Sequence, residues 1–289
     1  MDLLPLPAHG DTPVRVMTIA GSDSGGAAGL QSDLRTFTLA GVHGTCAVTA
    51  VTVQNSLGVS AFHPIPPATV AGQIRAVIGD IGVGAVKTGM LADAGIIAAV
   101  ADTAAELGIG GRTGEGAAGI PFLVDPVSAS HHGDPLLSPE AFALLVGRLF
   151  PLATVVTPNL DEVRLLTGIE VVDEATQRDA ARALHDMGPC WALVKGGHLR
   201  TAATSTDLLY DGTEFLEFEA HRIVTTHDHG AGDTLGAAMV CALAHGTTVP
   251  EAVAFGKRWV TRSLDAAYPL GAGHGAVNAS WRLREAPPA

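Results

Sequence analysis

An aspartate preceded by three small residues stands near the C-terminal end of this 289-residue chain. The stretch THDHGAGDTLGAAMV (226–240) places Gly230, Ala231 and Gly232 before Asp233, and an alanine-rich run typical of a helix follows. Unpaired N–H groups and the helix dipole make such a helix start suitable for binding an anion. A carboxylate there would repel phosphate, but it can take a proton from a neutral hydroxyl beside a phosphoryl group. The pattern therefore predicts phosphoryl transfer to an alcohol. The alternative is that Asp233 only caps the helix and that the glycines only form the turn before it.

A second glycine-rich stretch, AGSDSGGAAGLQSD (20–33), occupies the other end of the chain. It begins after a strand-like run with Gly21 and leads into a helical pattern that contains Asp33. Its glycines permit close packing or left-handed turns. The stretch is therefore a candidate ligand loop, although an ordinary strand–helix turn explains the same pattern.

Polar residues also follow three other strand-like runs. Asp125 ends PFLVDP, Lys195 ends WALVKGG, and Asn159 with Glu162 follows TVVTP. Asn159 and Glu162 are three apart and share a helix face, which suits Mg²⁺ held through water, but a capping box explains this spacing equally well. A lysine at a strand end can reach a transferring phosphate or can lie solvated at the surface.

The elements that must position these residues alternate along the chain. Short β-branched runs predict strands at 14–21, 45–54, 84–89, 121–126, 154–158 and 191–197. Helical patterns cover 30–41, 68–80, 138–150, 173–188, 233–245 and 249–266. This alternation predicts an α/β fold, a mostly parallel sheet with helices on both faces. The stretch 206–223 predicts a hairpin at one edge, and the chemically suited residues follow strand ends, where such sheets bind ligands.

Composition narrows the class of protein. Hydrophobic residues make up 47% and aromatic residues 4%, so Val, Ile, Leu and Ala must build the core. The net charge of −12 argues against nucleic acid or an anionic membrane as partner. Three widely spaced cysteines, no signal-peptide pattern and no long apolar run lead us to expect a cytoplasmic protein. We expect one domain at 13–282, with loose ends at 1–12 and 283–289.

The motifs taken together resemble those of a known family. Gly230-Ala231-Gly232-Asp233 is similar to the signature of ribokinase-like kinases, a family of three-layer α/β sandwiches. AGSDSGGAAGLQSDLRTF, KTGML, GDPLL, TPNLDE and KGGH narrow the resemblance to the hydroxymethylpyrimidine/phosphomethylpyrimidine kinases of thiamine biosynthesis, over 14–277. This resemblance implies ATP-dependent phosphorylation of the hydroxymethyl group of 4-amino-5-hydroxymethyl-2-methylpyrimidine, and then of its monophosphate. It also implies ATP and Mg²⁺, and it is compatible with a monovalent cation such as K⁺ and with a homodimer.

The resemblance implies a role for each matched residue. Asp233 would be the base, and the N–H groups of Gly230, Ala231 and Gly232 would hold the charge that develops on the phosphoryl group. Asp125 and Glu162 would organise Mg²⁺ through water. The nucleotide would contact Asn159, Glu162, Lys195 and Gly197, and the pyrimidine pocket would be lined by Gly21, Asp33, Gln54, Met90 and Val127.

Two departures from the family pattern keep alternatives open. Many members carry cysteine where Asp233 stands, and a Lys-Ser pair usually stands where this chain has His131 and His132. The second difference leaves open whether the second phosphorylation occurs. The alternatives are a pyridoxal/pyridoxine kinase and a catalytically silent pyrimidine-binding sensor of the same fold.

Overall fold

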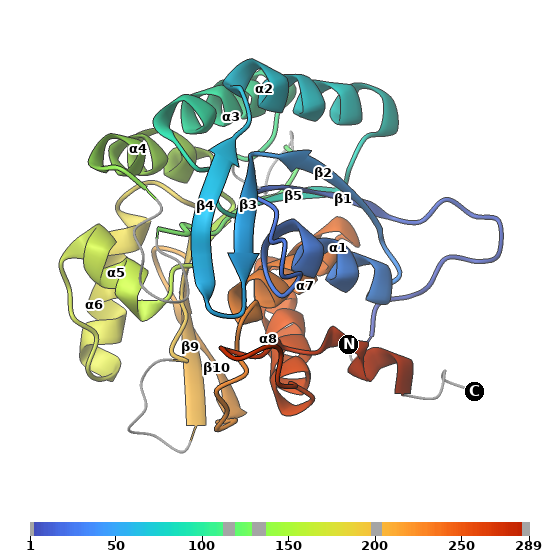
Figure 1. The fold of residues 1–289 in the computed structure, drawn as a ribbon. Coiled ribbons are helices and arrows are strands. Elements are labelled where there is room, and N and C mark those ends of the chain that lie inside the picture. Colours follow the sequence, from blue (N-terminus) through green and yellow to red (C-terminus); the bar gives the residue numbers. More distant parts are fainter. Residues whose placement is uncertain (1–2, 112–118, 129–136, 198–203, 285–289) are drawn as a thin grey trace.

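The central element of the fold is a twisted, mostly parallel sheet (Figure 1). The computed structural model describes residues 3–111, 119–128, 137–197 and 204–284. In these residues eight strands pair in the order β10-β9-β8-β7-β6-β5-β1-β2. All neighbours from β8 to β2 are parallel, whereas β9 and β10 form the antiparallel edge hairpin that the sequence predicts. The bounds are β1 Arg15–Ala20, β2 His43–Val48, β5 Ala85–Thr88, β6 Phe122–Val124, β7 Val155–Val156, β8 Trp191–Val194, β9 Thr204–Tyr210 and β10 Phe215–His221.

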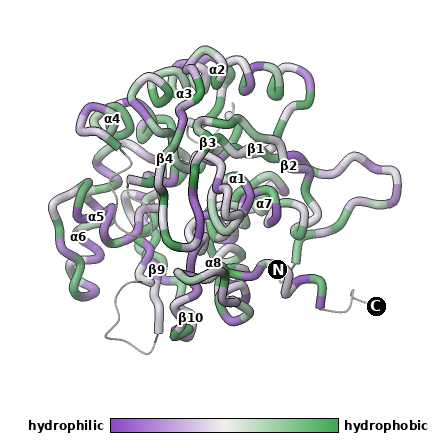
Figure 2. The backbone as a smooth tube through the Cα atoms, viewed as in Figure 1, coloured by the Kyte–Doolittle hydropathy of each residue, from purple (hydrophilic) through white to green (hydrophobic). Residues whose placement is uncertain are grey.

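Helices cover both faces of this sheet and form two separate apolar cores. One face carries α2 Pro67–Ala76, α3 Ala94–Leu107, α4 Pro139–Leu144, α5 Leu160–Thr167 and α6 Glu174–His185. The other face carries α1 Gly29–Leu39, α7 Ala231–Ala244 and α8 Val249–Asp265. Successive strand residues alternate between the two cores, as Val16 and Met17 do. The predicted three-layer α/β sandwich is therefore confirmed. Hydrophilic and hydrophobic residues alternate along outer helices such as α6 (Figure 2).

The prediction of one strand over 45–54 is wrong. The chain leaves the main sheet after β2, and residues from Ala50 onward form β3 (Ala50–Asn55), which pairs with β4 (Gly58–Pro64) in a separate two-stranded sheet. Thr49 marks the junction, because its N–H donates to Ala20 O at 2.9 Å and its Oγ1 donates to Met90 O at 2.6 Å. An unbroken β-branched run conceals such a change of partner, since periodicity does not specify which sheet a strand joins.

The N-terminal segment, expected to be loose, is partly packed. Leu4 is buried in the core beside α7 and α8, and the chain then loops outward before β1 (Figure 1).

Within the described ranges no helix is long and apolar enough to cross a membrane. The three cysteines, Cys46, Cys190 and Cys241, are not joined by disulfide bonds.

Candidate active site

The predicted site residues meet at the carboxyl-terminal edge of the parallel strands. The chain goes from β1 to β2 on one side and returns to place β5 on the other side of β1, so the strand order reverses between β1 and β5. Ligands of open α/β sheets bind in the crevice at such a point. Asp125 follows β6 and Lys195 follows β8, and the Lys195 ammonium donates to Asp125 Oδ1 at 3.2 Å. Residues 70 positions apart in the sequence thus form one ion pair at this edge.

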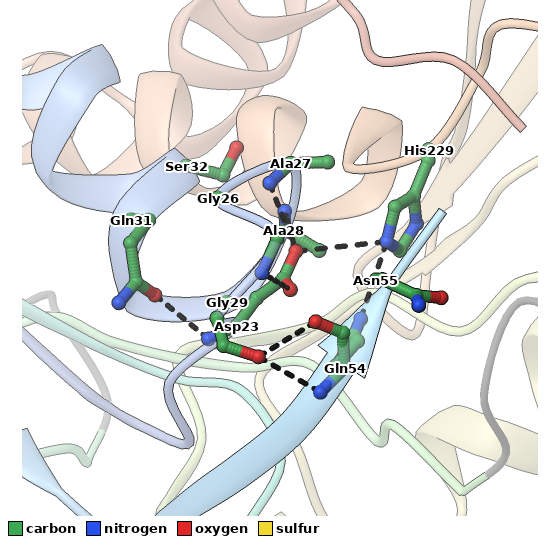
Figure 3. A network of polar contacts seen from close by, with 12 residues as sticks. Asp23, Gly26, Ala27, Ala28, Gly29, Gln31, Ser32, Gln54, Asn55 and His229 are labelled. Atoms are coloured by element: carbon green, nitrogen blue, oxygen red, sulfur yellow. Dashed lines mark hydrogen bonds and ion pairs between the residues drawn. The ribbon is translucent and has the colours of Figure 1, made fainter. Parts of the chain in front are cut away.

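The loop after β1 is folded around a buried carboxylate, that of Asp23 (Figure 3). Asp23 Oδ1 accepts a hydrogen bond from Gly25 N at 2.7 Å, and Oδ2 accepts from Ala27 N and Ala28 N, each at 2.8 Å. The N–H of Asp23 in turn donates to Gln31 Oε1 at 2.8 Å. A single carboxylate therefore fixes the path of the glycine-rich loop into α1. No pattern in the sequence indicated that Asp23 organises this loop.

The two glycine-rich stretches pack directly against each other, although they lie at opposite ends of the sequence. Gly230 adopts φ +82°, and a Cβ there would overlap with the carbonyl oxygen of Ala27. Gly29 donates its N–H to Asp233 Oδ2 at 3.1 Å. Loop and helix start therefore form one surface, which only glycine permits at position 230.

The start of α7 has the features of an anion site. Gly230 is the N-cap residue, and within the described residues no side chain caps the helix. Ala231 N donates to Asp228 O at 3.1 Å, so this amide is already engaged in a turn. A Cβ on Gly232 would lie 3.5 Å from Lys195 Nζ and 3.8 Å from Asp125 Oδ2, which places the helix start beside the ion pair. Dipole, amides and ammonium thus converge on one spot.

Asp233 is the partly exposed member of a charged trio whose other members are Lys87 and Asp33. The Lys87 ammonium donates to Asp33 Oδ1 at 2.7 Å and to Oδ2 at 2.8 Å, and it lies 3.6 Å from Asp233 Oδ1. The side chains of Lys87 and Asp33 are 0% exposed, whereas that of Asp233 is 17% exposed. Asp33, which was expected to line the pyrimidine pocket, is enclosed by Lys87 and Thr18.

Burial perturbs the ionisation of this trio. Loss of hydration raises the pKa of Asp33 to about 7, because it outweighs the charge of Lys87, and the nearby Asp233 carboxylate raises it further. Burial alone would lower the pKa of Lys87, but the charges of Asp33 and Asp233 outweigh that effect and raise it. Lys87 is therefore a permanent cation between two carboxylates.

Asn159 and Glu162 form the capping box of α5, the alternative that the spacing left open. Asn159 Oδ1 accepts from Glu162 N at 2.9 Å, and Glu162 Oε2 accepts from Asn159 N at 2.8 Å. Glu162 also faces the site: burial raises its pKa to about 8, Lys195 lowers it, and the charge of Asp125 raises it. The two carboxylates therefore repel each other at a place where a cation would relieve the repulsion.

The raised pKa of Glu162 predicts a pH-dependent stability. Between its ordinary value of 4.5 and about 8, folded Glu162 holds a proton that the unfolded chain has released. The free energy of unfolding should therefore fall as pH rises through this window. Glu162→Gln preserves a capping-box acceptor but cannot ionise, so Tm should fall less steeply with pH than in the unmodified chain, by several degrees over the window.

Thermal unfolding at a series of pH values measures this difference. Asp33 adds a slope of the same sign up to about 7, so the variant should reduce the slope without abolishing it. Glu170→Gln, at an exposed position, is the matched control and should retain the full slope. Identical slopes in all three chains would contradict the assignment to Glu162.

Of the other residues expected in the pyrimidine pocket, Gly21, Gln54 and Met90 lie around the loop after β1, and Val127 lies beyond β6. Gly21 N donates to Met90 O at 3.1 Å, and a Cβ on Gly21 would lie 2.5 Å from Met90 Cε, so these two residues are in contact. Gln54, on β3, places Nε2 3.2 Å from His229 Nε2 (Figure 3). Val127 follows Asp125, and its N–H donates to Asp125 O at 2.9 Å. His229 Nε2 also lies 3.7 Å from Asp23 Oδ2.

The glycine turn after Lys195 is held by a further buried ion pair. Asp207 Oδ1 accepts from Gly196 N at 2.8 Å, while Asp207 Oδ2 lies 2.9 Å from Lys257 Nζ. Arg222 Nη1 donates to Gly197 O at 2.6 Å. These contacts fix the backbone at Gly197, the predicted nucleotide contact, from α8 and from the segment after β10.

The carboxylates fit a cation that a nucleotide brings with it. Among the described residues no three His, Cys, Asp or Glu side chains are grouped to hold a metal ion. Mg²⁺ usually keeps several waters and uses one or two carboxylates plus phosphates, a pattern that Asp125 and Glu162 can complete. His131 and His132, which bear on the second phosphorylation, lie outside the described residues.

Comparison with known proteins places this geometry in context. The profile of the family described as phosphomethylpyrimidine kinase matches residues 23–278. Over 282 residues the chain is 61% identical to the hydroxymethylpyrimidine/phosphomethylpyrimidine kinase of Mycobacterium leprae, covering 96% of this chain and 98% of that one. The fold is similar to Bacillus subtilis pyridoxal kinase, solved as an ADP complex (TM-score 0.83, 34% identity, 94% and 99% of the two chains), and to Clostridium difficile phosphomethylpyrimidine kinase (0.73, 34%, 86% and 98%).

Proposed function

The chain belongs to the phosphomethylpyrimidine kinase family, as its motifs predicted, and from this membership we propose that it transfers the γ-phosphoryl group of ATP to the hydroxymethyl group of 4-amino-5-hydroxymethyl-2-methylpyrimidine. The observation that carries this proposal is the convergence at the start of α7. There a partly exposed carboxylate, Asp233, adjoins amides that lie beside Lys195 and Asp125. A proton acceptor beside an anion site is what phosphoryl transfer to an alcohol requires.

In the proposed reaction Asp233 takes the proton of the substrate hydroxyl while the hydroxyl oxygen bonds to the γ-phosphorus of ATP. The bond between the γ-phosphorus and the bridging oxygen of the β-phosphate breaks, and ADP leaves. The amides of Gly230 and Gly232 and the Lys195 ammonium stabilise the charge on the phosphoryl oxygens, whereas the Ala231 amide, also expected in this role, already donates to Asp228 O. Mg²⁺, held by the phosphates with Asp125 and Glu162 acting through water, would neutralise phosphate charge. Gln54 presents an amide that can donate and accept at once, which suits a ring nitrogen beside an amino group. Gly21, Met90 and Val127 complete this pocket.

The proposal extends to features that the described residues support less directly. Phosphorylation of the monophosphate to the diphosphate belongs to it, since the relatives' name contains both kinases. A monovalent cation such as K⁺ and a homodimer also belong to it. In support of the homodimer, the β3–β4 hairpin exposes the apolar side chains of Val51, Val53, Leu57 and Phe62. Sedimentation velocity and assays with K⁺ or Na⁺ test these points.

Product analysis tests the proposed function. The chain is incubated with ATP, Mg²⁺ and the pyrimidine alcohol, and phosphorus NMR follows the products over time. We expect a monophosphate first and a diphosphate later. Because the pyridoxal kinase fold is closely similar, pyridoxal serves as the competing substrate. A higher kcat/KM for pyridoxal than for the pyrimidine alcohol would identify pyridoxal as the substrate. If ATP is consumed with neither the pyrimidine alcohol nor pyridoxal, the result would favour the silent pyrimidine-binding sensor.

A further inference from the structure

A buried ammonium beside the proton acceptor has no part in the function described so far. Lys87 lies at the end of β5, with its side chain fully enclosed. Its two short contacts, 2.7 and 2.8 Å, both go to Asp33 on α1, and Thr18 Oγ1 donates to Asp33 Oδ2 at 2.6 Å. Asp233 lies beyond hydrogen-bonding distance of this ammonium, at 3.6 Å. The ammonium is therefore shared unequally between the two carboxylates.

We propose that Asp33 and Lys87 are a positioning pair for Asp233: Asp33 holds the ammonium beside the Asp233 carboxylate, but too far away to occupy it with a hydrogen bond. At 3.6 Å the ammonium still attracts the negative charge of the Asp233 side chain. The Asp233 oxygens then remain available to the substrate proton. This inference rests on the proposed role of Asp233 as the base.

The surroundings leave Lys87 as the cation best placed for this task. Among the residues that the structure describes, the other charged or titratable groups near the trio are Asp125 after β6, Lys195 after β8 and Cys241 on α7. Lys195 already donates to Asp125, and burial raises the pKa of the Cys241 thiol, which stays neutral. Gly89 borders both partners, because a Cβ there would lie 3.8 Å from Asp233 Oδ1 and 4.0 Å from Lys87 Nζ.

The charges of the trio predict opposite effects for two substitutions. In Asp33→Asn, Lys87 loses its charged partner and turns to Asp233. The acid limb of the kcat profile should move to lower pH by about 1 unit. The plateau kcat should fall about 10-fold, because the carboxylate is now hydrogen-bonded to the ammonium. In Lys87→Met, Asp233 loses its cation, so the acid limb should move to higher pH.

A double variant shows whether Asp33 acts through Lys87. Asp33→Asn combined with Lys87→Met removes both charges and leaves no unpaired ion in the core. It should reproduce the kcat and the acid limb of Lys87→Met alone, because without the ammonium burial keeps the Asp33 carboxyl protonated, so that it bears no charge that could act on Asp233. This comparison stays decisive even if Asp33→Asn alone does not fold. Arg75→Met, which breaks the ion pair between α2 and α3, is the control: the acid limb should stay in place.

Three results would overturn the inference. The first is an unmoved acid limb in Asp33→Asn. The second is a shift of the acid limb by Asp33→Asn in the Lys87→Met background that equals the shift in the unmodified chain. The third is a rise in the KM of Asp33→Asn with no change in its kcat. The last would mean that Asp33 contacts the pyrimidine directly. Asp233→Asn separates these failures from failure of the proposed function. If that variant is inactive while the acid limb of Asp33→Asn is unmoved, the positioning role alone is wrong; if it is fully active, the base role itself is wrong.

Discussion

Asp233→Asn is expected to lower kcat by about 10²–10⁴-fold, the usual cost of removing a positioned base. Asparagine has nearly the same shape and keeps an oxygen that can accept the Gly29 N–H, which Asp233 Oδ2 accepts at 3.1 Å. The loop contact therefore survives, and Lys87 keeps Asp33 as its main partner. Because only the proton acceptor is lost, ATP and pyrimidine should bind nearly as before.

Steady-state kinetics and nucleotide titration measure this prediction together. The expected signature is a large fall in kcat with KM nearly unchanged, which indicates an interaction made in the transition state. Asp186→Asn, the same chemical change at an exposed position beyond α6, is the control and should be fully active. An Asp233→Asn variant with normal turnover would remove the basis for general-base catalysis at this residue.

The sequence specified the sheet edge better than it specified the contacts made there. Asp125, Lys195 and Asp233 were expected together because each follows a strand or opens a helix, and parallel strand ends meet at one edge. Such reasoning finds the edge but not the partners. Lys87 lies in the predicted strand 84–89, and nothing in the local sequence indicates that its ammonium faces α1 and α7.

Asp33 shows the same limit in a different way. Its place in the first turns of α1 was correct, but whether its side chain faces a pocket or the core depends on the rotation of the helix against the sheet. For Asn159 and Glu162 the local reading was sufficient, because a capping box is formed by residues of a single turn. Contacts within one turn can thus be predicted from spacing, whereas contacts between elements need the tertiary structure.

Gly230→Ala should lower kcat by about 10²-fold, since displacement of catalytic groups by about 1 Å is enough for such a loss. At φ +82° an alanine is strained, and its Cβ would overlap with the carbonyl oxygen of Ala27. The loop after β1 and the start of α7 would have to separate, which would break the contact between Gly29 and Asp233. Gly246→Ala isolates the strain, because Gly246 has φ +81° with open space around it. That control should lose only about 1–2 kcal/mol of stability and keep its kcat. If kcat and Tm respond alike in the two variants, contact between the two glycine-rich stretches is not what aligns the site.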